Sequence, residues 1–386
     1  MKDSTMVYLY TGGWILYYLQ SLIHLEGSLV STLWVAGLIL VSLFYVILCH
    51  VPEASIQKNK ISMFILSLDA LILLLTIYGV IFLFDDSLYI EEARYNYLKR
   101  IYCTLLTVYF FYYYAIKGVL TSSVMRRLTI AFSVYVIVNF VLFFFQNDSI
   151  VMTNNGGYLC VAMIPLMLLF ENRKGLQNGI VLFFSLLTIL SMKRGAILVM
   201  FVLLVVYFLW SYKRGRNKLK TILLVISLIS IITLLFIYLE NTNYYFQNRL
   251  YKTMNGYTSG RDELYSTLIW AFFEDTTDLQ FIFGRGALAT MVVTRKNMAH
   301  CDWLELATNQ GIIGVIVYFV YICSIIKTYI NRKVWNDQIY ILFMISIVII
   351  MKSLFSMSYS SMDVITFSAL GYILGCLRRE DCVIKK

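Results

Sequence analysis

Apolar runs close to twenty residues long recur along the whole of this 386-residue chain. About twenty apolar residues in a helix cross the hydrocarbon core of a bilayer, where only helices and closed barrels satisfy every backbone hydrogen bond. The chain is 60% hydrophobic and only 14% charged, a composition far from that of soluble proteins. The sequence therefore predicts an all-α, polytopic integral membrane protein.

We interpret twelve of these runs as transmembrane helices. They cover residues 6–23, 28–49, 61–84, 101–117, 128–145, 156–170, 176–192, 195–210, 221–239, 311–329, 339–355 and 364–377. The first run lacks a small-residue cleavage site, so we expect a retained helix rather than a signal peptide. An aromatic run from Tyr109 to Tyr114 indicates interfacial belts and helix packing.

A long polar segment separates the ninth run from the tenth. It divides the chain into an N-terminal transmembrane bundle (1–239), a large extracytoplasmic loop (240–310), and C-terminal transmembrane helices with a cytoplasmic tail (311–386). Membrane proteins mostly keep their loops short, so a polar loop of this length needs a reason. We expect it to carry a hydrophilic active site on one side of the bilayer.

The basic residues predict how the chain is oriented. When the amino terminus is placed in the cytoplasm and the runs alternate sides, most of the 32 Lys and Arg fall in cytoplasmic segments. The net charge of +10 is then explained by topology and by contact with anionic lipid. No nucleic-acid-binding module is recognisable, so we expect no nucleic-acid partner.

Several basic residues lie against this bias, on the predicted outer side. They are Lys193, Arg194, Arg249, Lys252, Arg261, Arg285, Arg295 and Lys296. Arginine suits phosphate because its planar guanidinium offers two parallel donors and stays charged. Some of these side chains are expected to snorkel to lipid headgroups. Arg194 and Arg261 instead adjoin a glycine, which lets a ligand approach the backbone closely.

His300 is the residue of the polar segment best suited to proton transfer near neutral pH. We expect a helix to begin near Asp302, whose side chain would cap it and leave His300 pointing into a cavity. Cys301 is the one outer thiol, but the sequence shows no partner that would activate it. The seven cysteines have no paired spacing, and no metal-binding or cofactor-binding motif is present, so neither a metal nor a cofactor is predicted.

Several short motifs in the second half occur in a characteristic order. They are Ser191-Met192-Lys193-Arg194-Gly195-Ala196, Gly260-Arg261, Gly284-Arg285-Gly286, His300, Trp303-Leu304-Glu305 and Gly311-Ile312-Ile313-Gly314. The ordered set resembles the O-antigen ligase and Wzy-type polymerase superfamily over about residues 190–330. Many relatives have Asn directly after the histidine, whereas this chain has Cys301, so the amide is missing from that position.

The resemblance implies a GT-C-like glycosyltransferase in the bacterial cytoplasmic (inner) membrane, with its active site on the outer face. Its substrates would be oligosaccharides carried on undecaprenyl pyrophosphate, and a flippase and a chain-length regulator would be partners. Arg194 and Arg261 would clamp the pyrophosphate in place of a metal ion, and His300 would accept the proton of the incoming hydroxyl. Arg285 would contact the second phosphate or the glycan, and Glu305 would also bind substrate.

Three activities remain open at this point. A polymerase joins repeat units into O-antigen, capsular polysaccharide or exopolysaccharide, whereas a ligase transfers the finished glycan to the lipid A core. The shared motifs do not separate the two, and we favour the polymerase because divergent polymerases are far more numerous. The third activity is non-enzymatic transport of lipid-linked sugars. It predicts charges near the bilayer midplane and internal repeats, and the sequence shows few of the first and none of the second.

Overall fold

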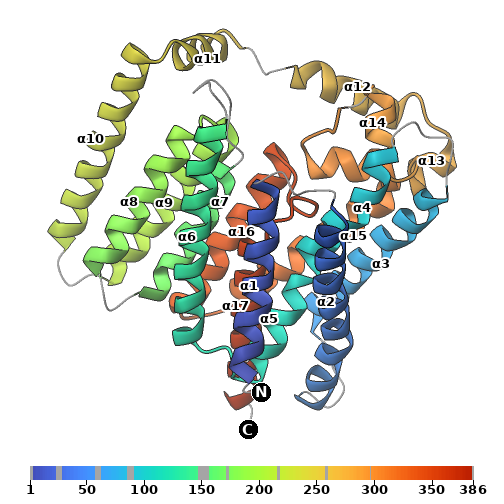
Figure 1. Cartoon of the computed structure of the whole chain (residues 1–386), viewed down its shortest axis with the longest axis horizontal. Helices are drawn as coiled ribbons and strands as arrows, with labels where there is room; N and C mark the ends of the chain where they lie inside the picture. Colours follow the sequence, from blue (N-terminus) through green and yellow to red (C-terminus); the bar gives the residue numbers. More distant parts are fainter. Residues whose placement is uncertain are drawn as a thin grey trace.

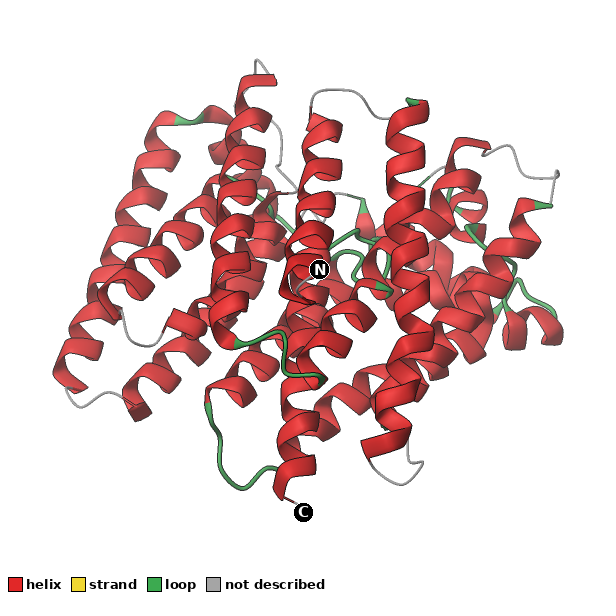
Figure 2. Ribbon diagram, turned by 60° about the horizontal axis from the view of Figure 1, so that its bottom comes forward, coloured by secondary structure: helices red, strands yellow, loops and turns green. Residues whose placement is uncertain are grey.

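The computed structural model describes residues 3–22, 28–56, 62–84, 91–146, 156–170, 174–214, 218–256, 260–295 and 297–384. Within these ranges every regular element is a helix and no strand is present (Figure 2). The predicted all-α fold is therefore confirmed.

The helices follow the predicted apolar runs closely. They are α1 (Asp3–Leu22), α2 (Leu29–Ile56), α3 (Met63–Leu83), α4 (Glu91–Leu105), α5 (Thr107–Ile116), α6 (Ser122–Gln146), α7 (Gly156–Leu166) with the 3₁₀ turn η1 (Met167–Phe170), α8 (Lys174–Leu190), α9 (Arg194–Arg214), α10 (Lys218–Thr242), α11 (Tyr244–Met254), α12 (Arg261–Phe273), α13 (Asp278–Phe283), α14 (Ala289–Val293), α15 (Asp302–Ile330), α16 (Asp337–Phe355) and α17 (Val364–Ile384). Each of the twelve predicted runs overlaps at least one of these helices.

The described part of the chain contains 6 helices that are long and apolar enough to cross a membrane. They are Leu29–Val51, Met63–Leu83, Ser122–Phe143, Arg194–Arg214, Asp302–Ile330 and Asp337–Phe355, and shorter apolar helices cover Gly156–Phe170, Lys174–Leu190 and Ile229–Thr242. The chain is thus a multi-pass membrane protein by helix length and composition. The count of twelve spans and the outer position of the polar loop remain predictions.

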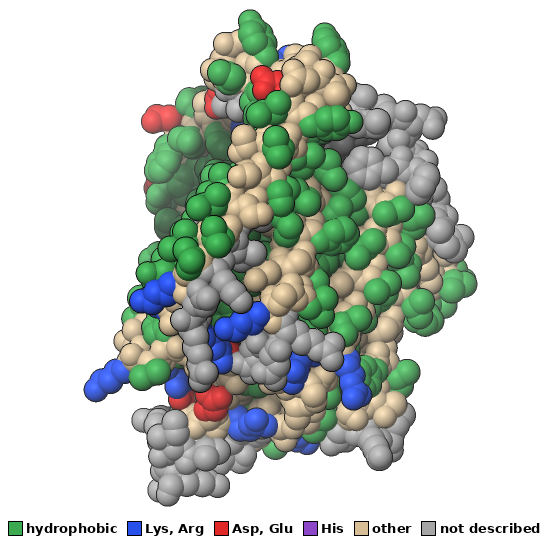
Figure 3. Space-filling model, turned by 90° about the vertical axis from the view of Figure 1, so that its left-hand side faces the viewer, with side chains coloured by type: hydrophobic (Ala, Val, Ile, Leu, Met, Phe, Trp, Pro, Cys, Tyr) green, Lys and Arg blue, Asp and Glu red, His purple; other side chains and the backbone are tan. Residues whose placement is uncertain are grey.

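The polar helices and the chain termini lie at opposite ends of the molecule. Figure 1 shows both termini at the lower end of the bundle and α11 to α14 at the upper end. Seen from the side of α10, apolar side chains cover the middle of the surface and basic ones gather near the lower end (Figure 3). Lys213, Arg214 and Lys218, where α9 ends and α10 begins, belong to that end. Basic residues gathered at one end are what the sequence predicts for the cytoplasmic side, and the orientation itself remains a prediction.

Helix α5 forms the centre of the bundle, and every one of its ten residues is buried. Gly371 and Gly375 on α17 let the two helices approach closely, since a Cβ at Gly371 would lie 2.4 Å from the carbonyl oxygen of Val108. The aromatic run from Tyr109 to Tyr114 lies on α5, so these rings serve helix packing. These rings are buried inside the bundle and do not form the interfacial belt that the sequence also suggested.

The polar segment contains four short helices, α11 to α14, of which α12, α13 and α14 pack on α15 and α11 packs on α10. The hydroxyl of Tyr78 on α3 donates to the carbonyl of Phe283 at the end of α13. Gln310 on α15 donates to the hydroxyl of Tyr97 on α4 at 3.1 Å. The division expected at 239/240 falls inside α10, and that at 310/311 falls at a kink within α15. Helices α3 and α4 therefore help to position whatever site the polar segment carries.

Candidate functional site

His300 lies in the turn that leads into α15. Its backbone is left-handed, with φ 51°, a conformation that histidine adopts more readily than most residues. Helix α15 begins at Asp302 as predicted, with Cys301 as its N-cap residue. His300 therefore precedes the helix and remains accessible to solvent.

Arg261 is the first residue of α12, which follows the left-handed Gly260 (φ 75°). Its Nη1 donates to the carbonyl oxygen of Phe355, the last residue of α16, at 3.0 Å. A guanidinium has five N–H donors, so this bond leaves others for a ligand. Partial burial raises the pKa of the neighbouring Tyr265, and the charge of Arg261 opposes that rise. Arg261 thus joins the start of α12 to the end of α16.

The Ser191–Gly195 junction connects α8 to α9 by a tight turn. Met192 is left-handed (φ 52°), and Arg194 is the first residue of α9. Gly195 lies so close to α7 and α16 that a Cβ there would be 2.2 Å from the hydroxyl of Tyr158 and 3.2 Å from Cβ of Phe355. The glycine of this motif is therefore required for close packing. It brings the junction to Phe355, the residue whose carbonyl binds Arg261.

The charges of two of these cations act on His300. The pKa of His300 is lowered below 6.5, first by partial burial and then by the positive charges of Arg261 and Lys193. Lys193 and Arg194 each also interact with a neighbouring group. Both α9 and α12 begin here, and helix N-termini add partial positive charge. The corner therefore holds a neutral imidazole beside two cations, an arrangement that can bind an anion and accept a proton.

Arg285 has different surroundings. Its Nη2 donates to the carbonyl oxygen of Ala271 at 2.8 Å and to the carboxylate of Asp275 at 3.2 Å, at the far end of α12 from Arg261. Ten residues of helix separate Arg261 from Ala271, about 15 Å at 1.5 Å per residue. The structure therefore does not bring Arg285 to the corner of His300, and its contacts attach the loop before α14 to α12.

Two glycines of the predicted motifs form a backbone contact. Gly311 (φ 67°, ψ −162°) breaks α15 into two helical parts, and a Cβ on it would lie 2.4 Å from the carbonyl oxygen of Ile282. A Cβ on Gly284 would lie 2.3 Å from the carbonyl oxygen of Asn309. The break leaves two carbonyls of α15 free to accept hydrogen bonds from the polar segment. The amide of Arg285 donates to the carbonyl of Thr308 at 3.0 Å, and the amide of Gly286 donates to the carbonyl of Asn309 at 3.0 Å. Both motifs thus serve to dock the polar segment onto α15.

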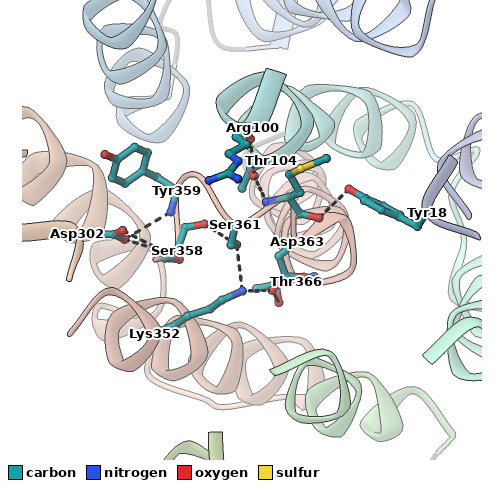
Figure 4. A network of polar contacts seen from close by, with 11 residues as sticks. Tyr18, Arg100, Thr104, Asp302, Lys352, Ser358, Tyr359, Ser361, Asp363 and Thr366 are labelled. Carbon is teal, nitrogen blue, oxygen red and sulfur yellow. Dashed lines mark hydrogen bonds and ion pairs between the residues drawn. The ribbon is translucent and has the colours of Figure 1, made fainter. Parts of the chain in front are cut away.

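Asp302 anchors a second loop, between α16 and α17, as Figure 4 shows. Its carboxylate accepts hydrogen bonds from the amide of Ser358 at 3.0 Å and from the hydroxyl of Tyr318 at 2.8 Å. The expectation that Asp302 would cap its own helix is wrong, because its oxygens bind these groups instead. The other side of the loop is held by the buried ion pair between Lys352 and Asp363, at 2.9 Å. The predicted runs 339–355 and 364–377 place a connection here, but the sequence did not indicate its anchoring to Asp302.

Glu305 points away from solvent into a cavity of about 320 Å³. The residue is 1% exposed. The cavity is also lined by Tyr97 and Arg100 of α4, by Met298, and by Tyr359 of the α16–α17 loop. Glu305 therefore faces a cavity that neither Arg261 nor Lys193 lines.

Catalysis by a cysteine nucleophile or by a bound metal ion receives less support. Burial raises the pKa of the Cys301 thiol, which disfavours a nucleophilic thiolate. In the described part of the chain, no group of three or more His, Cys, Asp or Glu side chains is arranged to hold a metal ion. Sequence reasoning missed the role of Lys193 beside His300, the Phe355 carbonyl and the α16–α17 loop. Only Lys193, which adjoins Arg194, carried a signal in the sequence.

Comparison with known families identifies the central part of the chain. Residues 179–319 match the family described as O-antigen ligase. The match includes the Ser191–Gly195 junction, the whole polar segment and the start of α15. The predicted membership of the O-antigen ligase and Wzy superfamily is thus confirmed for this segment. A comparison with curated proteins finds no match to the chain.

Proposed function

We propose that this protein is a metal-independent glycosyltransferase that polymerises oligosaccharide repeat units carried on undecaprenyl pyrophosphate, at the outer face of the cytoplasmic membrane. The observation that supports this proposal is the corner where Arg261, Lys193 and His300 meet at the N-termini of α9 and α12. An anionic leaving group and a proton acceptor are the two requirements of this reaction, and the corner offers both.

In the proposed reaction an acceptor hydroxyl oxygen bonds to the anomeric carbon of the donor glycan. The bond between that carbon and the pyrophosphate oxygen breaks, and undecaprenyl pyrophosphate leaves with the electron pair. A ring nitrogen of His300, kept neutral by its lowered pKa, takes the hydroxyl proton. Arg261 and the cations of the junction stabilise the charge that develops on the leaving group. A guanidinium suits this task because it stays charged and binds two phosphate oxygens at once.

We favour polymerisation over ligation because of the relative numbers of the two enzymes, not because of any residue near His300. Both reactions use the same donor chemistry, so the corner serves either one. Surface-polysaccharide gene clusters contain many divergent polymerases and usually one ligase per genome. Acceptor identity separates the two: a polymerase uses a lipid-linked glycan, whereas a ligase uses the lipid A core. Supplying each acceptor in turn to purified protein decides between them.

The deciding experiment for the chemistry is the pair Arg261→Lys and His300→Ala. Arg261→Lys keeps the charge and loses the two-pronged donor set, so we expect a loss of roughly 10²- to 10³-fold in polymer formation. His300→Ala should reduce turnover by roughly 10²- to 10⁴-fold, the usual range for a general base. Arg295→Lys makes the same chemical change at an exposed arginine and should leave activity unchanged.

The measurement is polysaccharide laddering in a strain that lacks the native gene, with membrane levels checked by immunoblot. Ladders of wild-type intensity from both Arg261→Lys and His300→Ala would overturn the enzymatic proposal. Transport of lipid-linked sugars without chemistry would then be the better explanation.

A further inference from the structure

The cavity behind the His300 turn is assembled from parts of the chain that are far apart in sequence. It lies between α4, the segment before α15, the first turns of α15 and the loop between α16 and α17. Its volume of about 320 Å³ is within the range of small-ligand pockets. Its polar lining comes from Asn96, Arg100, Glu305, Asn309 and Ser360. No residue of α4 or of that loop belongs to the segment matched by the family.

Glu305 is the clearest sign that the cavity binds something. Its side chain is 1% exposed, and the Thr290 side chain and the Ala299 backbone approach its carboxylate as donors without making a hydrogen bond of good geometry. The hydroxyl oxygen of Ser360 is buried in the same cavity and is likewise without a partner there. Buried acceptors with incomplete hydrogen bonding destabilise a fold, so the Ser360 hydroxyl and the remaining lone pairs of Glu305 are open to donors from a ligand or from water.

Arg100 of α4 lines the same cavity and offers complementary donors. Its side-chain Nη1 lies 3.7 Å from the sulfur of Met298, a weak acceptor, and among the described residues it pairs with no carboxylate. Most of its N–H groups are therefore available to the cavity. Tyr97, Tyr359 and the methionines supply apolar and aromatic surface beside these polar groups.

This combination selects the chemistry of the ligand. A polyhydroxylated ring donates hydroxyl hydrogens to Glu305, accepts hydrogen bonds from Arg100 and packs its C–H face on aromatic carbon. A pyrophosphate would meet the Glu305 carboxylate as a like charge in a buried site, which is unfavourable. The cations that suit pyrophosphate, Arg261 and Lys193, instead act on His300.

We propose that this cavity is a monosaccharide-binding subsite for the acceptor glycan, with Glu305 and Arg100 as its specificity-determining residues. The assignment to the acceptor rests on the function proposed above. Met298 lines the cavity, and two residues later His300 is beside the cations. The turn between them thus separates a sugar subsite from an anion subsite. His300 lies at this turn, where it can take the proton of a hydroxyl of the sugar bound in the cavity.

The test measures binding of two probes to the purified full-length protein in detergent. One probe is the free oligosaccharide repeat unit, released by mild acid from the lipid carrier of the strain that expresses the protein. The other is inorganic pyrophosphate. Glu305→Gln and Arg100→Gln should each weaken oligosaccharide binding roughly 10- to 100-fold, because each removes charge-assisted hydrogen bonds. Pyrophosphate binding should change less than about twofold.

Lys99→Gln is the matched control, because it removes a cation from the same helix without lining the cavity. It should leave both affinities at the wild-type value. Ser360→Leu fills the cavity from its other wall and should abolish oligosaccharide binding even if a substitution on α4 prevents folding. Thermal unfolding of each variant checks that the fold is intact.

The outcomes separate this proposal from the proposed function. Oligosaccharide binding that is absent in the wild type, or unchanged in Glu305→Gln, Arg100→Gln and Ser360→Leu, overturns the sugar subsite. Loss of pyrophosphate binding in these variants overturns it as well, since the cavity would then hold the donor phosphate. If oligosaccharide binding depends on Glu305 but the wild type transfers no glycosyl group, the proposed glycosyltransferase activity is refuted and the sugar subsite is supported.

Discussion

Replacing Gly311 by alanine tests whether the polar segment is held by backbone contact with the kink in α15. Gly311 has φ 67° and ψ −162°, a region that only glycine occupies readily. Its missing Cβ faces the carbonyl oxygen of Ile282 at 2.4 Å and the amide nitrogen of Gly284 at 2.5 Å. Both obstacles are backbone atoms, so no side-chain rotation can relieve the overlap. The loop of Gly284 must move away from α15.

The size of the effect follows from these contacts. The backbone conformation alone costs about 1–3 kcal/mol for a residue with a Cβ. Moving the loop by about 1 Å also breaks the bonds from the amides of Arg285 and Gly286 to α15, both 3.0 Å long. Each buried group left without its partner costs about 1–3 kcal/mol. Gly311→Ala should therefore destabilise the native state by at least about 3 kcal/mol, a large share of the stability of a typical protein.

Gly256→Ala is the matched control. Gly256 also has a left-handed backbone (φ 77°), but a Cβ there meets nothing within 4 Å, so this change carries the conformational cost without the overlap. We expect a loss of about 1–2 kcal/mol. Denaturant or thermal unfolding in detergent measures both variants. Equal stabilities for Gly311→Ala and Gly256→Ala would refute the docking contact. Activity should follow stability, because the docked loop continues through α14 to His300.

Other expectations follow from the site. Activity should fall as pH decreases through the lowered pKa of His300, below 6.5, because only the neutral ring accepts a proton. Lys193→Met removes a positive charge and should raise the pKa that limits activity at acid pH, whereas Lys193→Arg keeps the charge and should not. Identical kcat–pH profiles for wild type and Lys193→Met would exclude His300 as the base. Asp302→Ala leaves the buried amide of Ser358 without its acceptor and should cost at least about 1–3 kcal/mol in thermal unfolding, whereas a wild-type melting curve would contradict that anchoring role. Excess EDTA should leave transfer intact, and a metal requirement would refute the arginine clamp. Reporter fusions should read cytoplasmic at Asn331 and external at Thr290, and a cytoplasmic signal at Thr290 would remove the outer active site.

Much of the fold could be predicted because long apolar segments, identified by hydropathy, form membrane helices. Every predicted apolar run overlaps a helix, and the start of α15 at Asp302 was placed correctly. Arg261 and His300 belong to ordered motifs of one family, and the charge of Arg261 acts on the imidazole, whereas their catalytic roles remain predictions. Hydropathy alone did not decide how many helices cross the bilayer, because short and kinked helices give weak signals.

The remaining parts of the site have no comparable sequence signal. Phe355 contributes a backbone carbonyl to Arg261, and a carbonyl is present at every residue. Arg100 lies in a helix with no motif, and only the packing of α4 beside Met298 brings it to the cavity. The Gly284-Arg285-Gly286 motif suggests ligand binding from its composition, yet the same pattern is needed to let two backbones touch. Residue type and order do not distinguish these two uses.

The geometry around His300 depends on conformations that the chain would not adopt by itself. Among the described residues, five non-glycine residues have a positive φ; of these, Met192 adjoins Lys193, Leu288 lines the cavity and His300 lies at the turn between them. Each such residue costs about 1–3 kcal/mol, so it persists only where surrounding contacts impose it. Those contacts are the Gly284–Gly311 docking, the Gly195 packing and the Asp302 anchor. In the proposed reaction, the bundle would supply the rigidity that holds these charges in place, and preorganised charges stabilise a transition state without rearrangement during the reaction.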